Sequence, residues 1–174
     1  MKNMISRRNF LAAAGVVAAA GVLTACGGSS SSAAASGAAS GAAASGDTIK
    51  VGVLGPLTGD VSVYGQAVVN GATLRLKQAN EEGGINGKQI EIISMDEQGD
   101  PTQAVTCFTK MCDQGITALV GDVTTAPTLA VAAESADYNM PMVTASATAE
   151  SVTYDAETDT VNGNVFRATF TDPF

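Results

Sequence analysis

Hydrophobic and polar positions alternate along residues 48–174 in blocks that predict strands and helices in turn. Short apolar runs, rich in β-branched residues, predict five strands, over residues 48–54, 89–95, 116–120, 141–145 and 164–169. Apolar residues at helical spacing predict three helices, one after the loop 55–65, one from Pro101 to about Asp113, and one over residues 127–137. This order predicts right-handed βαβ units, and therefore an α/β fold with a parallel sheet covered on both faces.

Residues at the ends of these segments support the same boundaries. Asp100 and Pro101 suit the N-cap and first position of a helix, with Gln103 placed as in a capping box. Gly83-Gly84 and Gly115 are typical helix stops, and Asn86-Gly87 predicts a tight turn.

The segment 116–127 is the most informative part of the pattern. A buried strand breaks at Gly121 and passes through Thr124 and Thr125 into Pro127, which suits the first turn of a helix. Free backbone N–H groups, a helix dipole and hydroxyl groups would then meet at one point and receive an anion. Because no Lys or Arg lies between Lys110 and Arg167, a carboxylate fits better than a phosphate. Alternatively, one of the two threonines is only an N-cap.

Ligands of parallel sheets bind beyond the carboxyl ends of the strands. Three such ends, residues 55–64, 121–125 and 144–148, consist mainly of Gly, Thr, Ser and other small residues. They predict a neutral, hydroxyl-lined crevice for a small polar ligand. Tyr64 either packs against the helix that follows it or forms a wall for an apolar ligand group.

Other chemistry is disfavoured. The spacing of Gly52 and Gly55, followed by Pro56, does not match a dinucleotide-binding loop, so no cofactor is expected. Asp96 and Glu97 lack the pattern of a calcium loop and are expected in a solvated loop, so no metal is expected either.

Charge and composition exclude further classes. All 17 acidic residues follow residue 46, whereas three of the nine basic residues precede it, so the part after residue 46 carries a net charge of −11. Such a domain repels nucleic acid. The absence of His removes the usual catalytic base, and no catalytic residues are expected. Cys107 and Cys112 lie five positions apart on one predicted helix, with Cα atoms roughly 8–9 Å apart, and are expected to be free thiols.

The N-terminal residues 1–26 predict an export signal, because Lys2 and two arginines precede an apolar run that is too short to span a membrane comfortably. Residues 23–26 resemble a lipobox, which implies that Cys26 is lipidated and anchors the protein to the cell membrane. Residues 6–11 resemble a twin-arginine motif, although a Sec signal also begins with basic residues. Residues 27–46 contain only Gly, Ser and Ala and predict a flexible tether.

Several motifs of the domain (residues 47–174) resemble the substrate-binding lipoproteins of branched-chain amino acid ABC transporters. The matching segments are residues 49–59, 64–65, 80–87, 100–101 and 146–148. This resemblance implies a type 1 periplasmic-binding fold, of which the chain would form the first part of the Rossmann-like N-terminal lobe, without the second lobe.

The resemblance also implies roles for particular residues. Thr125, with Thr124 beside it, would hold the ligand carboxylate, and Tyr64 would be a pocket aromatic. Ser146 would offer its carbonyl to the ligand ammonium, and Thr148 its hydroxyl and amide. The implied function is extracytoplasmic capture of a small amino acid and its delivery to the membrane subunits of an ABC permease. A ligand-sensing domain of a signalling system is the alternative.

Overall fold

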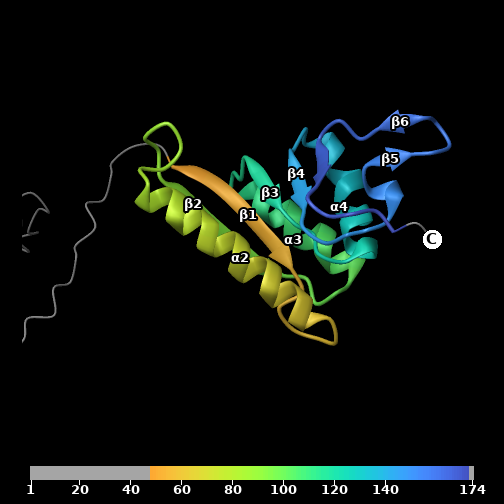
Figure 1. Ribbon diagram of the computed structural model, residues 1–174, viewed down its shortest axis with the longest axis horizontal. Coiled ribbons are helices and arrows are strands. Elements are labelled where there is room, and N and C mark those ends of the chain that lie inside the picture. The colour runs from red at the N-terminus through yellow and green to blue at the C-terminus, as the bar shows by residue number, and fades with distance from the viewer. Residues whose placement is uncertain (1–47, 173–174) are drawn as a thin grey trace, which may run out of the picture. The chain divides into compact units, whose positions relative to one another are not determined.

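The computed structural model describes residues 48–172 as an α/β domain (Figure 1). The predictions for the export signal, the tether and Cys26 lie outside these residues. The main elements are β1 (Ile49–Gly55), α2 (Ser62–Glu81), β2 (Ile90–Asp96), α3 (Pro101–Asp113), β3 (Ala118–Val120), α4 (Thr125–Asp137), β4 (Met142–Thr144) and β7 (Val165–Arg167). The predicted succession of strands and helices is therefore confirmed.

The five strands form one parallel sheet in the order β2-β1-β3-β4-β7. The chain moves from β1 to β2 on one side and then crosses back to β3 on the other. The loops that follow β1 and β3 therefore leave in different directions from neighbouring strands, which is the arrangement that opens a crevice at the carboxyl end of a sheet.

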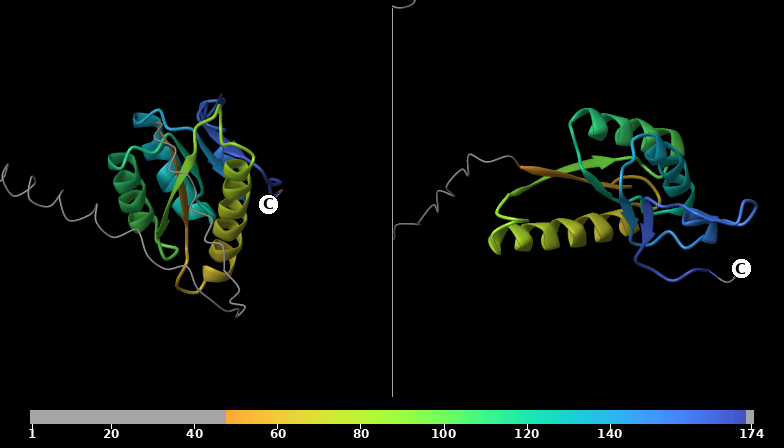
Figure 2. Two further views of the ribbon diagram at one scale, coloured as in Figure 1. Left: turned by 90° about the vertical axis from the view of Figure 1, so that its left-hand side faces the viewer. Right: turned by 90° about the horizontal axis from the view of Figure 1, so that it is seen from above.

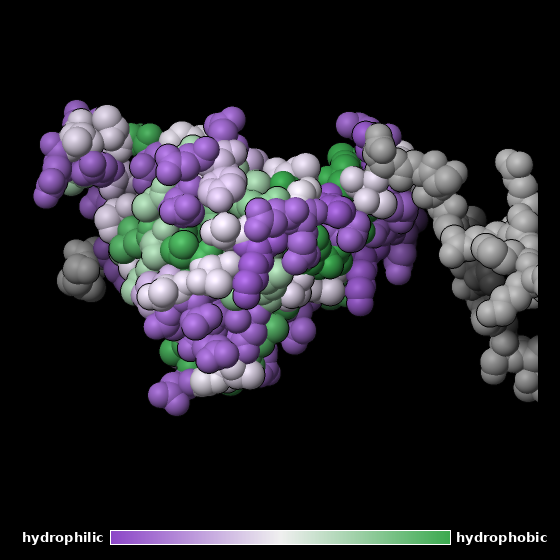
Figure 3. Space-filling model, turned by 180° about the vertical axis from the view of Figure 1, so that it is seen from behind, coloured by the Kyte–Doolittle hydropathy of each residue, from purple (hydrophilic) through white to green (hydrophobic). Residues whose placement is uncertain are grey.

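The helices lie on both faces of the sheet. Figure 2 shows α2 along one face and α3 with α4 along the other, and α3 and α4 pack against each other. The core lies between the sheet and the α3–α4 layer. Its largest fully buried side chains are Leu54, Phe108, Met111, Leu119, Val131 and Met142. Seen from behind in Figure 3, hydrophobic surface appears as small areas among hydrophilic residues.

Local chemistry sets the element ends as expected. The side chain of Asp100 accepts a hydrogen bond of 2.8 Å from the backbone N–H of Gln103, and Pro101 is the first residue of α3. Asn86 and Gly87 both have positive φ and form the turn between Ile85 and Lys88.

Two features differ from the sequence predictions. Helix α2 begins at Ser62, so Tyr64 lies in its first turn and does not end the preceding loop. This early start depends on Gly65, because a Cβ there would overlap the carbonyl of Pro56. The chain also forms a short 3-10 helix, η1 (Glu150–Val152), and a two-stranded hairpin of β5 (Tyr154–Asp155) and β6 (Thr160–Val161). Strands β5 and β6 are each two residues long. This is too short to show the alternation of hydrophobic and polar residues from which a strand is predicted.

Candidate functional site

The first turn of α2 and the segments that follow β3 and β4 meet at a hollow of about 300 Å³. Its lining residues are Tyr64, Val123, Thr124, Thr125 and Ser146. Four of the five ligand-binding residues expected from the sequence are therefore brought together by the fold. No Lys or Arg lines this hollow, so any anion there would be held by hydroxyl groups and backbone dipoles.

Helix α4 points its N-terminus at the hollow. Its N-cap residue, Thr124, has an extended backbone and makes no hydrogen bond from its side chain to the first turn. The carbonyl of Thr124 instead accepts bonds from both the N–H and the hydroxyl of Thr128. Within residues 48–172, the N–H groups of Thr125 and Ala126 have no partner, and Pro127 has none to offer. Thr124 is thus the N-cap residue by position, as the simpler alternative held, but its side chain makes no capping hydrogen bond.

Ser146 ties the β4 loop to the β3 loop. Its hydroxyl donates a 2.6 Å hydrogen bond to the carbonyl of Val123. The hydroxyl of Thr144, the last residue of β4, donates a 2.6 Å bond to the carbonyl of Asp122, which directly precedes Val123. No described group donates to the backbone carbonyl of Ser146, and its role toward a ligand ammonium stays a prediction.

Thr148, the fifth expected residue, does not line this hollow. Its hydroxyl donates to the carboxylate of Asp172, and its carbonyl accepts bonds of 3.1 Å from the Arg167 guanidinium and from the N–H of Asp172. A role for Thr148 in binding remains a prediction.

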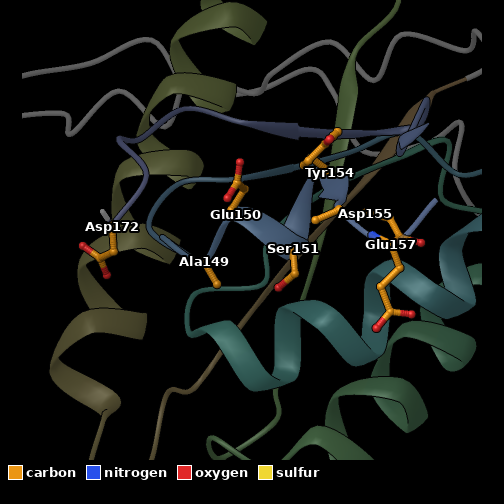
Figure 4. Close-up of a pocket in the computed structure, with 8 residues that line it drawn as sticks. Ala149, Glu150, Ser151, Tyr154, Asp155, Glu157 and Asp172 are labelled. Atoms are coloured by element: carbon orange, nitrogen blue, oxygen red, sulfur yellow. The ribbon is translucent and has the colours of Figure 1, made fainter. Parts of the chain in front are cut away.

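A second, larger hollow of about 600 Å³ lies beyond Thr148, at η1 and the hairpin. Figure 4 shows its side chains, with Asp172 near one end and Glu157 near the other. Two of its carboxylates bind local groups: Asp155 accepts from the N–H of Glu157 and the hydroxyl of Thr158, and Asp172 accepts from the hydroxyl of Thr148. No pattern in the sequence predicts this hollow.

Asp96 and Glu97 lie at the end of β2, where a solvated loop was expected. Glu97 is fully buried, and that expectation is wrong for it. Asp96 holds the β1 loop: its Oδ1 accepts from the N–H groups of Leu57 (2.8 Å) and Thr58 (3.3 Å), and its Oδ2 accepts from the hydroxyl of Thr58 (2.6 Å). Burial acts to raise the pKa of Asp96, but these hydrogen bonds and one from Gln98 outweigh it and leave the pKa below its usual value.

Asp122 is the functional candidate that sequence reasoning missed. It is fully buried at the end of β3, between Gly121 and the hollow-lining Val123. A Cβ at Gly121 would overlap the carbonyl oxygen of Leu54, and its φ of 138° suits glycine alone, so this residue brings the turn against β1. The sequence did contain a sign of this residue, because Asp122 directly follows a buried strand and a glycine.

Two absences concern the described part of the chain. Among residues 48–172, no cluster of three or more metal-ligating side chains is present. None of the helices in the same range is long and apolar enough to cross a membrane.

The chain belongs to the periplasmic binding protein family, whose sequence model matches residues 48–173. The resemblance inferred from the motifs is therefore confirmed, and so is the fold class. In addition, residues 4–24 match the signal sequence of the twin-arginine translocation pathway. This match and the family together indicate export from the cytoplasm.

Particular relatives refine this placement. The leucine-, isoleucine-, valine-, threonine- and alanine-binding protein of Pseudomonas aeruginosa is 38% identical over 107 residues, which are 62% of this chain and 29% of that protein. The substrate-binding protein LivJ of Streptococcus pneumoniae, solved with isoleucine, is 32% identical with a TM-score of 0.67, over 74% of this chain and 35% of LivJ.

A third relative shows a different ligand. The solute-binding protein of an ABC transporter from Rhodopseudomonas palustris, solved with p-hydroxybenzoic acid, is 26% identical with a TM-score of 0.60, over 72% of this chain and 32% of that one. The matched region thus spans about a third of the length of these relatives.

Proposed function

We propose that the protein captures a small amino acid, branched-chain or similar, outside the cytoplasm and delivers it to the membrane subunits of an ABC permease. One observation carries this proposal: the N-terminus of α4, with two unpartnered N–H groups, opens into the hollow lined by Tyr64, Thr124, Thr125 and Ser146. Binding involves no covalent chemistry. The relatives described above give no support to the signalling alternative.

The ligand class follows from the chemistry of this hollow. The ligands solved with the two relatives, isoleucine and p-hydroxybenzoic acid, share a single carboxylate. In our proposal the carboxylate lies at the N-terminus of α4, against the hydroxyl groups of Thr124 and Thr125. The carbonyl of Ser146 then accepts from the ammonium group, which favours an amino acid over a simple carboxylic acid. Tyr64 and Val123 supply apolar contact for the ligand side chain.

A membrane anchor completes the proposal. Export followed by lipidation of Cys26 would hold the domain near the permease through the tether of residues 27–46. Expression in a bacterial host with a radiolabelled fatty acid should label the protein, and Cys26→Ser should abolish the label. Unlabelled protein with an intact Cys26 would contradict the anchor without affecting the ligand proposal.

The binding proposal is tested by titrating isoleucine into the ¹⁵N-labelled 174-residue chain and recording amide chemical shifts, which detect weak binding. We expect concentration-dependent shifts at Thr124, Thr125 and Ala126. Thr125→Ala should reduce them, whereas Thr102→Ala, at the exposed start of α3, should not. Shifts elsewhere in the domain, or none with isoleucine and p-hydroxybenzoate alike, would overturn the proposal.

A further inference from the structure

Two buried carboxyl groups meet across the end of β1. Glu97 follows β2 and Asp122 follows β3, and these strands are the two neighbours of β1 in the sheet. Both side chains have 0% exposure. Each carboxyl group is among the groups that shift the pKa of the other, so the two side chains lie close together. Neither residue has a part in the ligand contacts proposed above.

Each carboxyl group uses one oxygen locally and leaves the other without a partner among the described groups. Oε2 of Glu97 accepts a 2.6 Å bond from the N–H of Gly99, and Oδ1 of Asp122 accepts from the N–H of Val123. The remaining oxygens, Oε1 of Glu97 and Oδ2 of Asp122, are buried and receive no N–H or O–H from any other described group. Among the described groups no other donor reaches these two oxygens, and a proton held between them would satisfy both.

Among the described residues, no basic side chain acts on the pKa of either carboxyl group, although Lys110 of α3 acts on that of the neighbouring Cys107 thiol. The outside groups that act on Glu97 are the N–H groups of Gly99 and Asp100 and the negative charge of Asp96. From α3, the buried thiol of Cys107 faces the same two carboxyl groups. Two adjacent carboxylates without a counter-ion cannot both ionise in such a site.

We propose that Glu97 and Asp122 share one proton, and that the resulting O–H···O bond positions the β3 loop that lines the ligand hollow. The bond joins the ends of β2 and β3. The carbonyl of Asp122 extends the connection to β4 by accepting from Thr144, and the carbonyl of Val123 does so by accepting from Ser146. Asp122 is thus a positioning residue, two positions before Thr124.

Titration of the pair gives the proposal a pH signature. Burial, with the charge of Glu97, raises the pKa of Asp122 from 3.8 to about 8, and burial also raises the pKa of Glu97. The folded protein therefore holds a proton that the unfolded chain releases. This contribution to stability is complete below the unfolded pKa, declines as the pH rises from about 4 to about 8, and is absent above that range.

Amide substitutions separate a shared proton from simple packing. In Asp122→Asn, the amide oxygen accepts from Val123 and the NH₂ group faces Glu97, so it supplies permanently the donor that the proton supplied. Glu97→Gln does the same from the other side. In the double variant the two NH₂ groups face each other, and neither finds an acceptor. Both single variants should therefore remain stable, and the double variant should be less stable than either.

The experiment is thermal unfolding of the 174-residue chain between pH 5 and 9, with infrared detection of protonated carboxyl groups at pH 7. The wild-type midpoint should fall as the pH rises to about 8, more steeply than in either single variant. The double variant should unfold roughly 5–10 °C below the singles. A protonated-carboxyl band should be present in the wild type, absent in Asp122→Asn, and retained in the control Asp60→Asn, which changes an exposed residue.

The proposal is overturned if the double variant is as stable as the singles, or if the wild type shows no protonated-carboxyl band at neutral pH. The consequence for the ligand loop rests on the proposed function: isoleucine-induced shifts at Thr124 should be lost in the double variant and restored when one amide is reverted. Loss of these shifts from the wild type as well would contradict the proposed function, while unfolding and infrared data would still decide the shared proton.

Discussion

The hydroxyl of Ser146 lies 2.6 Å from the carbonyl oxygen of Val123 and donates a hydrogen bond to it, so the loops after β4 and β3 are fixed to each other beside the hollow. Val123 immediately precedes the N-cap of α4. A change at Ser146 therefore acts on the start of a helix that is distant from it in sequence.

Ser146→Ala removes this connection. We expect a loss of about 1 kcal/mol in the free energy of unfolding, because the Val123 carbonyl loses its donor. Isoleucine-induced shifts at Thr124 and Thr125 should also weaken, because the helix start is no longer held. Denaturant unfolding and the amide titration measure the two effects. Ser151→Ala, at an exposed serine without a side-chain hydrogen bond, is the control and should change neither.

Gly65→Ala tests how closely the first turn of α2 approaches Pro56. The new Cβ would overlap the Pro56 carbonyl, which is backbone and cannot rotate away. We expect a loss of about 1–3 kcal/mol from this overpacking. Gly71→Ala is the matched control on the same helix, where a Cβ meets no atom within 4 Å, and it should gain about 0.5–1 kcal/mol through higher helix propensity. Equal effects of the two substitutions would contradict the packing seen at Gly65.

Asp96→Asn tests the carboxylate that holds the β1 loop. The pKa of Asp96 is below 3.8 in the folded protein, so its contribution is present above the unfolded pKa and is lost as the pH falls through the folded one. Acidification below about pH 4 should therefore destabilise the wild type more than Asp96→Asn. The measurement is the unfolding midpoint against pH. The control Asp60→Asn, in the loop between β1 and α2, should keep the wild-type acid dependence. If Asp60→Asn lost this dependence as well, the assignment to Asp96 would be contradicted.

The two cysteines of α3 should differ in reactivity. Burial raises the pKa of both thiols, but Cys107 is only 8% exposed, whereas Cys112 is half-buried. In the native protein, with Cys26 changed to Ser, an alkylating reagent should modify Cys112 well before Cys107. Mass spectrometry of timed samples gives the order. A bridge between Cys107 and Cys112 would contradict the structure, in which both are free thiols.

Much of the fold follows from local sequence chemistry. Apolar runs, the Asp100 cap and the Asn86-Gly87 turn each act within a few residues, so they could be recognised without tertiary information. The gathering of Thr124, Thr125 and Ser146 was also predictable, because the carboxyl ends of parallel strands share one edge.

What escaped prediction depends on distant neighbours. Glu97 is buried beside Asp122, which lies 25 positions further along the chain and follows the strand on the other side of β1. Only the assembled sheet brings these two residues together. Thr148 is held away from the hollow by hydrogen bonds with Arg167 and Asp172. These partners are distant in sequence, and hydrophobic periodicity does not reveal them.

Strand β2 is added on one side of β1, and β3 and β4 are added on the other. The walls of the hollow therefore come from separate crossovers on the two faces of the sheet. Side chains at Tyr64 and Thr125 can accordingly be exchanged one at a time, while the strands beneath them keep their register. A scaffold of this kind suits the evolution or engineering of new ligand preferences. The residues that would contact the ligand are largely separate from the buried sheet and helix core that stabilises the fold.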